Sequence, residues 1–594
     1  MDRLDLAAME DAIDNEEFQD AQESVTRLPD DLTLEATIDE AFQSVHLFFN
    51  NKFDEARNLL LPLHKSSMYH ALGLSVFKYL EAILTFEEEH ISSASDALKN
   101  CINVCNQYRR KNTFSESLGK MVKKPNYDSY TPEEVHAELC YAEAMLFKSA
   151  LTIIEDETLV SFIKAGLKIR SCFSSYRECS HILSSRTWTK DCHKVHFESG
   201  VRMGVGGFNL MISLLPARVI KLLEFIGFTG SKSTKKDFKE VGLQELETGY
   251  NLDKSLRQVL CTMTLLGYHL IVVFTLNHVE GDVQLCERIL NNELKKYPNG
   301  VWFLFFKGRL EFVKGNISSA IEWYTKSWKS QDVWPQFHHL CFWELMWANC
   351  LNQDWRMAAS FAERLCQESR WSKTVYMYQK AAMLAMLGDN LTAEEACEIE
   401  KLIQDAPKYK QRIAGKSLPM EKFIVKKSER YFKQKKHLVL PAIELLYLWN
   451  LFRILGKDWK FADSVFRLIE RMLNKPSVCV EFEGDNRALL LLLKGACLRQ
   501  MNKPLLAEEA LREAIGLETK IKEDNYIVPY AIVELGLLQL DLNESEKAAA
   551  LLEDAKKNYT GYSLESRLHF KIHSALTELA KSKKLQKNGK RESS

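Results

Sequence analysis

The sequence predicts an all-α protein, built as a solenoid of stacked antiparallel helix pairs. Three observations predict this fold class. Glycine and proline are scarce, with 25 and 13 among 594 residues, and all-β folds need many of both at their turns. Small and large apolar residues recur at fixed offsets in several stretches of the chain. Glycine or asparagine also stands at a constant distance before most of the expected second helices, where a helix-ending residue is needed.

The internal repeat combines a small residue, a second small residue twelve positions later, a large apolar residue and a further small one. This spacing is the tetratricopeptide pattern, and it occurs at Gly308, Ala320, Tyr324 and Ser327, at Gly495, Ala507, Leu511 and Ala514, and at Gly536, Ala548, Leu552 and Ala555. Small residues are needed where two helix axes approach to about 8–10 Å. The large residue is expected in the gap between neighbouring pairs, which must stack because one pair cannot cover its own apolar face. We therefore expect a right-handed superhelix of helix pairs.

Turn residues support the same register. Asparagine and glycine tolerate the left-handed backbone that ends many helices. They stand five residues before the small position of each second helix, at Asn51, Gly281, Gly315, Asn502 and Asn543, before Ala56, Cys286, Ala320, Ala507 and Ala548. Two departures are visible. The unit around Ala358 has Met346 and Gln353 in place of the glycine and the turn residue, and Ala507 to Ala548 spans 41 residues, an insertion of about two helical turns.

Composition and repeats divide the chain into eight segments. The two ends are charged, and we expect an acidic N-terminal segment at 1–34 and a basic disordered tail at 581–594. Between them we expect helical pairs at 35–110, a polar loop at 111–137, a helical region outside the generic repeat at 138–255, a central array at 256–405, a basic helical linker at 406–437 and a C-terminal array at 438–580.

Several motifs outside the repeat are more specific. They are GVGGFNL at 204–210, SLLP at 213–216, GFTG at 227–230, LPMEKF at 418–423, LPAIELLYLWN at 440–450 and ESRLHFKIH at 565–573. Together they resemble the tetratricopeptide repeat protein 39 family, which is similar to fungal outer-membrane or inclusion-body clearance proteins. The resemblance covers residues 35 to 580 and implies an intracellular, all-helical, non-catalytic protein whose repeats bind other proteins. Some members are linked to lipid or sterol handling. The stretch 231–241 is longer and more charged than the usual link of the family.

No motif predicts catalysis, a cofactor or a metal. The stretch from Gly227 to Thr234 imitates the tail of a phosphate-binding loop, but its glycines are too close together and lysine does not follow the second directly. The glycines at 204–207 are more consistent with close helix packing than with a nucleotide loop. Six cysteines and histidines lie within 25 residues and are either zinc ligands or buried thiols and surface histidines: Cys172, Cys179, His181, Cys192, His193 and His196. Their cysteine spacing lacks the tight pairs of a structural zinc site, so we expect none.

Eight of the 11 tryptophans lie between Trp302 and Trp371. Aromatic rings of this kind either pack between helices or line a groove for a ligand. We expect most of them in the core. They are Trp302, Trp323, Trp328, Trp334, Trp343, Trp347, Trp355 and Trp371.

The net charge of −1 excludes a broadly basic, nucleic-acid-binding molecule. The charge is nevertheless segregated, because the first forty residues hold fourteen acids and the stretch 408–436 holds eleven Lys and Arg. Such a stretch is either a solvated helix face or a contact to an acidic partner, an anionic membrane or the acidic N-terminus of the chain. The candidate contact residues are Lys426, Lys427, Lys433, Lys435 and Lys436.

The N-terminus lacks a signal-peptide pattern, and fourteen irregularly spaced cysteines suit a reducing compartment. The uncharged stretch 260–276 is expected to be a buried helix rather than a membrane span. We therefore expect a cytoplasmic scaffold that binds client proteins through the solenoid groove, with a position on an organelle surface as the alternative. The alternative function is a peripheral membrane or lipid-droplet factor linked to lipid or sterol homeostasis or inclusion clearance. A clamp for chaperone C-termini needs lysine at the fifth and asparagine at the ninth position of first helices. It is not supported, because Arg309, Ala496 and Leu537 follow Gly308, Gly495 and Gly536.

Overall fold

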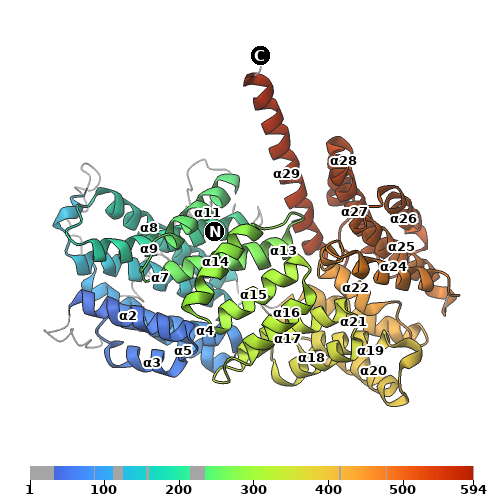
Figure 1. The fold of residues 1–594 in the computed structure, drawn as a ribbon, viewed down its shortest axis with the longest axis horizontal. Helices are drawn as coiled ribbons and strands as arrows, with labels where there is room; N and C mark the ends of the chain where they lie inside the picture. The colour runs from blue at the N-terminus through green and yellow to red at the C-terminus, as the bar shows by residue number, and fades with distance from the viewer. Residues whose placement is uncertain are drawn as a thin grey trace. The chain divides into compact units, whose positions relative to one another are not determined.

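Figure 1 shows the fold of the chain, a computed structural model that describes residues 33–85, 87–110, 125–155, 159–214, 235–413, 416–476 and 478–592. These residues are mostly helical, which confirms the predicted all-α class. Within the described ranges, extended structure is confined to a two-stranded sheet of the strands β1 (Arg412–Ile413) and β2 (Lys416–Ser417). The predictions that concern residues 1–32, 111–124 and 215–234, including the GFTG stretch, lie outside the described residues.

The chain forms two compact units. Unit 1 comprises Met1–Leu266 with Ile413–Gly415, and unit 2 comprises Gly267–Arg412 with Lys416–Ser594. The described helices of unit 1 are α2 (Leu34–Phe49), α3 (Phe53–Leu60), α4 (Met68–Thr85), α5 (Glu88–Tyr108), α7 (Pro132–Glu155), α8 (Leu159–Ser185), α9 (Asp191–Leu214), α11 (Lys235–Tyr250) and α12 (Gln258–Gly267).

Glycines in α9 let two neighbouring helices approach it closely. A Cβ at Gly204 would lie 1.8 Å from the Tyr176 ring in α8, and a Cβ at Gly206 would lie 3.1 Å from the Gly242 carbonyl oxygen in α11. Neither position has room for a side chain. This confirms the packing interpretation for Gly204 and Gly206, whereas a Cβ at Gly207 would meet no atom within 4 Å. Tyr176 belongs to the large apolar core of unit 1.

Unit 2 contains two sets of helix pairs. The first set follows a π-helical turn (Tyr268–Val272) and consists of α13 (Val273–Leu276), α14 (Val283–Lys296), α15 (Val301–Lys314), α16 (Ile317–Trp328), α17 (Gln336–Leu351), α18 (Trp355–Glu368), α19 (Lys373–Ala385) and α20 (Ala393–Asp405). After α21 (Pro419–Lys433) come α22 (Pro441–Leu448), α23 (Phe452–Leu455), α24 (Trp459–Leu473), α25 (Glu483–Gln500), α26 (Pro504–Gly516), α27 (Ile527–Asp541), α28 (Ser545–Asn558) and α29 (Glu565–Glu592). We call α22–α29 the C-terminal array.

The predicted repeat register is present, with one refinement. The predicted small residues Ala56, Cys286, Ala320, Ala507, Ala514, Ala548 and Ala555 are all fully buried. The large apolar residue lies over the glycine of its own pair, since a Cβ on Gly308, Gly495 or Gly536 would come within 2.7, 2.5 and 3.1 Å of Tyr324, Leu511 and Leu552. The sequence predicts these residues in the gap between pairs. Tyr324 also contacts the next pair, because its hydroxyl donates a hydrogen bond to the Glu344 carboxylate at 3.2 Å.

The predicted turn residues adopt a left-handed backbone, with φ of 66° at Asn51, 86° at Gly315, 55° at Asn502 and 62° at Asn543. Gln353, in the degenerate unit, does the same with φ of 59°.

Gly281 differs from this prediction, because it is not among the residues with positive φ. A Cβ at this position would lie 2.3 Å from the backbone oxygen of His269. The glycine is therefore needed for a close approach of two backbones and not for a left-handed turn.

The predicted insertion between Ala507 and Ala548 is a short 3-10 helix (Glu518–Lys520) followed by a loop that leads to α27. The side chain of Asp485 fixes this loop by accepting the backbone N–H groups of Lys522, Glu523 and Asp524 at 3.0, 2.9 and 2.9 Å. The insertion therefore carries Asp524 into the interior, where it is buried.

The C-terminal tail is helical where the sequence predicts disorder, because α29 continues to Glu592. The first part of α29 is anchored by buried Ile572, Ala575 and Leu579. Once this nucleus exists, each further residue is added at little cost. The tail sequence KSKKLQK at 581–587 consists largely of good helix formers.

Candidate functional site

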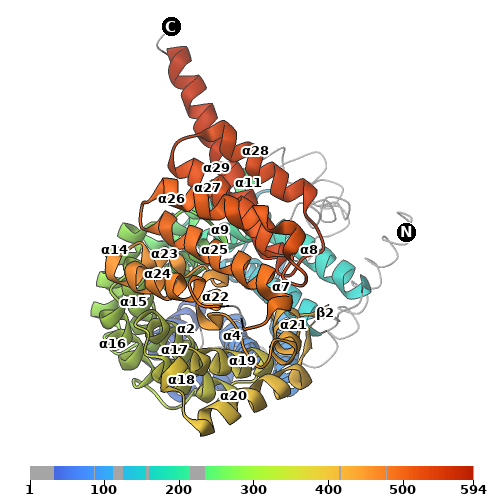
Figure 2. The ribbon, with the colours of Figure 1, turned by 90° about the vertical axis from the view of Figure 1, so that its right-hand side faces the viewer.

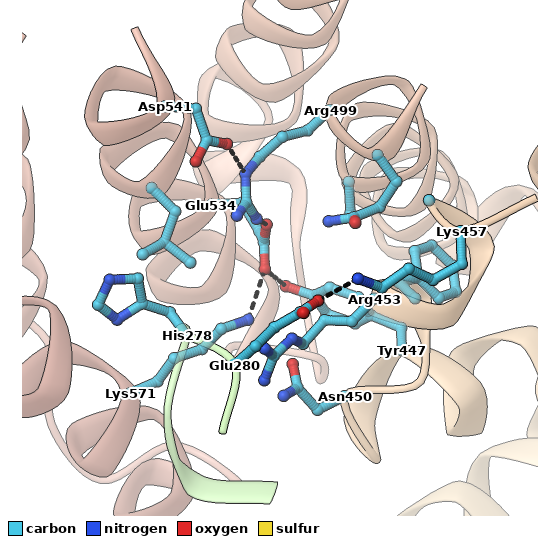
Figure 3. A pocket seen from close by; sticks show the side chains of 15 residues that line it. His278, Glu280, Tyr447, Asn450, Arg453, Lys457, Arg499, Glu534, Asp541 and Lys571 are labelled. Carbon is cyan, nitrogen blue, oxygen red and sulfur yellow. Dashed lines mark hydrogen bonds and ion pairs between the residues drawn. The ribbon is translucent and has the colours of Figure 1, made fainter. Parts of the chain in front are cut away.

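The main candidate site is a cavity of about 260 Å³ on the C-terminal array, which we call the inner pocket (Figure 3). Its walls come from the first helices of successive pairs, α22/α23, α25 and α27, from the terminal helix α29, and from the loop before α14. Figure 2 shows α22, α25, α27 and α29 following one another across the array. The lining residues are His278, Glu280, Tyr447, Asn450, Phe452, Arg453, Gly456, Lys457, Ala496, Arg499, Gln500, Glu534, Leu537, Asp541 and Lys571.

Helical spacing explains why these side chains share one wall. Residues three, four or seven positions apart lie on the same face of a helix. Glu534, Leu537 and Asp541 therefore project from one face of α27. Between α22 and α23 the chain turns at Asn450, which has φ of 64°. Asparagine tolerates this left-handed conformation better than most residues, and the turn brings Arg453 to the pocket.

Glu534 is the buried centre of the charged network. Its carboxylate accepts hydrogen bonds from Arg499 at 2.7 Å, Lys571 at 2.8 Å and the Tyr447 hydroxyl at 3.2 Å. Burial alone would raise the pKa of Glu534, but the charges of Lys571 and Arg499 outweigh it and lower the pKa to about 2. The carboxylate is thus ionised and ties α22, α25, α27 and α29 together.

The other two carboxylates of the pocket are paired as well. Asp541 accepts from Arg499 at 2.7 Å, and Glu280 pairs with Lys457. The guanidinium of Arg453 instead donates to two backbone oxygens, of Phe274 at 3.2 Å and Asn277 at 3.1 Å. In the part of the chain that the structure describes, no carboxylate lies at ion-pair distance from Arg453.

Three basic groups of the pocket, His278, Arg453 and Lys571, have lowered pKa values. Burial lowers the pKa of His278 to about 4, and the nearby Arg499, Lys571 and Arg453 add to the effect. Burial likewise lowers the pKa of Arg453 to about 10, which Glu280 opposes and Arg499 reinforces. The pKa of Lys571 is also lowered, chiefly by burial. His278 is therefore neutral at pH 7.

Two of the three residues that follow the repeat glycines, and that do not support a chaperone clamp, face this pocket. Ala496 and Leu537 line it but carry no charge. The basic groups come from Arg499, three residues after Ala496, and from Arg453 and Lys571. The repeat spacing does not predict these residues. The ESRLHFKIH motif contains Lys571, and LPAIELLYLWN contains Tyr447 and Asn450, so the motifs that carry the family resemblance supply part of the pocket.

The predicted basic linker is a 3-10 turn, the small sheet and α21, and its lysines have different environments. Lys427 is buried and pairs with Glu444 at 2.6 Å and Asp524 at 2.8 Å, so it is not available to an external partner. Lys433 and Lys436 are exposed and pair with Glu523 at 2.9 Å and Glu400 at 2.7 Å. Lys426 and Lys435 are exposed.

The cysteines and histidines of the candidate zinc site do not converge. Cys172 and Cys179 lie in the core of unit 1, His193 and His196 are buried in α9, and Cys192 is exposed. Across the described ranges, no group of three or more His, Cys, Asp or Glu side chains is arranged to hold a metal ion.

Most of the clustered tryptophans are at least partly buried. Trp334, Trp347 and Trp355 are buried, and Trp371 is exposed. The other four of the cluster, at positions 302, 323, 328 and 343, are half-buried. Trp343 and Trp347 both pack against Trp449, with ring centroids 5.0 and 6.2 Å apart. The cluster therefore contributes to helix packing in unit 2, as expected for most of its members.

Among the described residues, the helical stretch Gln258–Leu276 is long and apolar enough to cross a membrane, and 56% of an 18-residue window within it is buried. It contains the π-helical turn Tyr268–Val272. Within this turn, the Nδ1 atom of His269 accepts the backbone N–H of Asp282 at 3.0 Å. Length and composition alone do not separate a membrane span from a core helix.

Comparison with known proteins gives a family match and a close relative. The family described as Iml2/Tetratricopeptide repeat protein 39 matches residues 42–501. Tetratricopeptide repeat protein ttc-39B of Caenorhabditis elegans is 35% identical over 567 residues, which cover 94% of this chain and 95% of the relative.

Solved structures show more distant similarity. The APC/C hetero-tetramer Cut9-Hcn1 has a TM-score of 0.24 and 13% identity, with 92% of this chain and 97% of the other covered. Yeast Tom70 has a TM-score of 0.23 and 12% identity, with 93% and 96% covered.

Proposed function

The chain belongs to the Iml2/Tetratricopeptide repeat protein 39 family, and from this premise we propose that it is a non-catalytic scaffold that binds a client protein in the inner pocket. The observation that carries the proposal is the origin of the pocket walls. Successive repeats each contribute side chains from a first helix. Stacked repeats create extended concave binding surfaces in this way.

The chemistry of the pocket favours binding over catalysis. Its described lining includes no serine, threonine or cysteine. A general base works best with a pKa near the operating pH and a free lone pair. Glu534 has a pKa of about 2 and accepts three hydrogen bonds, and His278 has a pKa of about 4. Neither group suits proton transfer at neutral pH.

The proposal includes a location in the cytoplasm. All fourteen cysteines are free thiols in the structure, and eleven of them are buried. Free thiols suit a reducing compartment.

The proposal is tested by proximity labelling with a matched pair of variants. Gln500→Trp places a large ring in the lining of the inner pocket. Arg512→Trp places the same ring on an exposed position of the second helix α26. We expect that the wild type and Arg512→Trp label a set of proteins that Gln500→Trp does not label. All three proteins should be equally helical by circular dichroism. Identical sets for the three would contradict the proposal.

A peripheral membrane role is a second candidate, favoured by the apolar stretch Gln258–Leu276. We propose to test it by flotation with anionic liposomes. Joint replacement of the exposed Lys426, Lys433, Lys435 and Lys436 by glutamine should abolish flotation if these lysines hold the membrane. Absence of the wild type from the floating fraction would exclude this candidate. Lys427 is left unchanged because it is buried.

A further inference from the structure

The inner pocket has an excess of positive charge. Four basic side chains and three carboxylates line it, and the three carboxylates are all engaged by Arg499, Lys571 or Lys457. Arg453 contacts only backbone oxygens among its described hydrogen-bond partners. It is therefore the cation whose charge is least compensated.

Figure 3 shows the charged ends of Arg453, Lys571, Glu280 and Glu534 pointing toward one another in the pocket. Enclosing several cations near each other is unfavourable unless an anion compensates them. The lowered pKa values of His278 and Arg453 agree with this geometry, because burial is their main cause and the neighbouring cations add to it.

The size and charge of the pocket restrict the anion. A cavity of about 260 Å³ holds the volume of roughly nine waters at about 30 Å³ each, which is enough for one acidic side chain. The excess charge is one, so a monoanionic carboxylate balances it. A phosphate dianion would face Glu280, Glu534 and Asp541 with one negative charge left over. A guanidinium also presents a planar pair of donors that fits a carboxylate.

We infer that the inner pocket binds a carboxylate from an acidic peptide segment of the client, with Arg453 as the principal contact and Lys571 and Arg499 as supporting cations. This inference rests on the proposed function. It adds the chemical class of the segment that the scaffold recognises. In this arrangement the ion pairs of Glu534 hold Arg499 and Lys571 in position before the carboxylate of the client binds.

The test uses full-length protein and fluorescein-labelled hexaglutamate, with labelled hexaglutamine as the neutral match. Fluorescence anisotropy should show binding of hexaglutamate that weakens with added salt. Replacing Arg453 by glutamine should weaken it roughly ten- to hundredfold, as expected for loss of a hydrogen bond to a charged group. Arg487→Gln is the control, because Arg487 lies on α25 outside the pocket and pairs with Glu513 on the surface. It should leave the affinity unchanged.

A second measurement needs no substitution. A bound carboxylate stabilises the imidazolium form, so hexaglutamate should raise the pKa of His278 measured by NMR in the wild type. The inference is overturned if hexaglutamate binds no better than hexaglutamine, or if the pKa of His278 stays constant at saturation. It is also overturned if a phosphoserine hexapeptide binds more tightly than hexaglutamate. If one of these results is found while Gln500→Trp still loses client labelling, the proposed function stands. Only the inference that the pocket binds a carboxylate is then rejected.

Discussion

Replacing Lys427 by methionine should strongly destabilise unit 2. The ammonium of Lys427 lies between Glu444 at 2.6 Å and Asp524 at 2.8 Å, and all three side chains are less than a tenth exposed. Methionine fills similar space but removes the charge. Asp524 keeps Arg430 as its partner, whereas Glu444 keeps only the Tyr526 hydroxyl among the contacts described. Removing one partner of a buried ion pair costs about 3–5 kcal/mol, because the other charge stays buried without compensation.

The cost should depend on pH. Burial raises the pKa of Glu444 even in the presence of Lys427, and without the ammonium the pKa rises further. At a pH between the pKa of Glu444 in the unfolded chain and its higher pKa in the folded variant, the folded variant binds a proton that the unfolded chain lacks. Its stability therefore increases as the pH falls toward the unfolded value of about 4.3. The double variant Lys427→Met, Glu444→Gln should recover part of the loss at neutral pH.

Hydrogen exchange of the backbone amides of residues 522–524 is the assay, because these amides are held by Asp485 beside the network. The stated cost corresponds to exchange between about a hundredfold and several thousandfold faster than in the wild type. Lys426→Met, at the exposed neighbouring position, should change stability by no more than about 0.5 kcal/mol. The reasoning is refuted if these amides exchange at the wild-type rate in Lys427→Met. It is also refuted if Lys427→Met and Lys426→Met change the exchange rate equally.

Three further predictions concern the register, a titrating group and a helix cap. Gly495→Ala should cost about 1–3 kcal/mol in thermal unfolding, because its Cβ would lie 2.5 Å from Leu511. Gly516→Ala, with no atom within 4 Å of its Cβ, should be neutral within about 0.5 kcal/mol; equal losses would contradict the packing. His278→Gln should flatten the fall of stability between about pH 6.5 and 4, because His278 is held neutral in the folded protein while the unfolded chain takes up a proton there; an unchanged pH profile would exclude this role. Thr392→Ala should lower the melting temperature by the loss of about 1 kcal/mol, since Thr392 forms a capping box at α20; an unaltered melting temperature would show that the cap contributes nothing.

The sequence predicted the parts of the fold that depend on local spacing. The glycine and alanine positions follow because closely packed helices need small residues where they cross. Most of the left-handed turns follow because asparagine or glycine is needed where a helix ends. The inner pocket could not be predicted in the same way. Its charges lie at different offsets in each repeat, and Arg453 reaches it only because the first helix breaks at Asn450. The burial of Lys427 could not be predicted either, because its partner Asp524 lies in the irregular insertion, outside the repeat spacing.

The ion pairs of Glu534 have a consequence for how this chain can evolve. Solenoids commonly lengthen or shorten by duplicating or losing a repeat, since most repeats contact only their neighbours. Here Tyr447, Arg499, Glu534 and Lys571 stand on four consecutive first helices and meet at one carboxylate. Adding or deleting one helix pair would separate a donor from that carboxylate by the thickness of a repeat. The number of repeats between α22 and α29 is therefore fixed by the site.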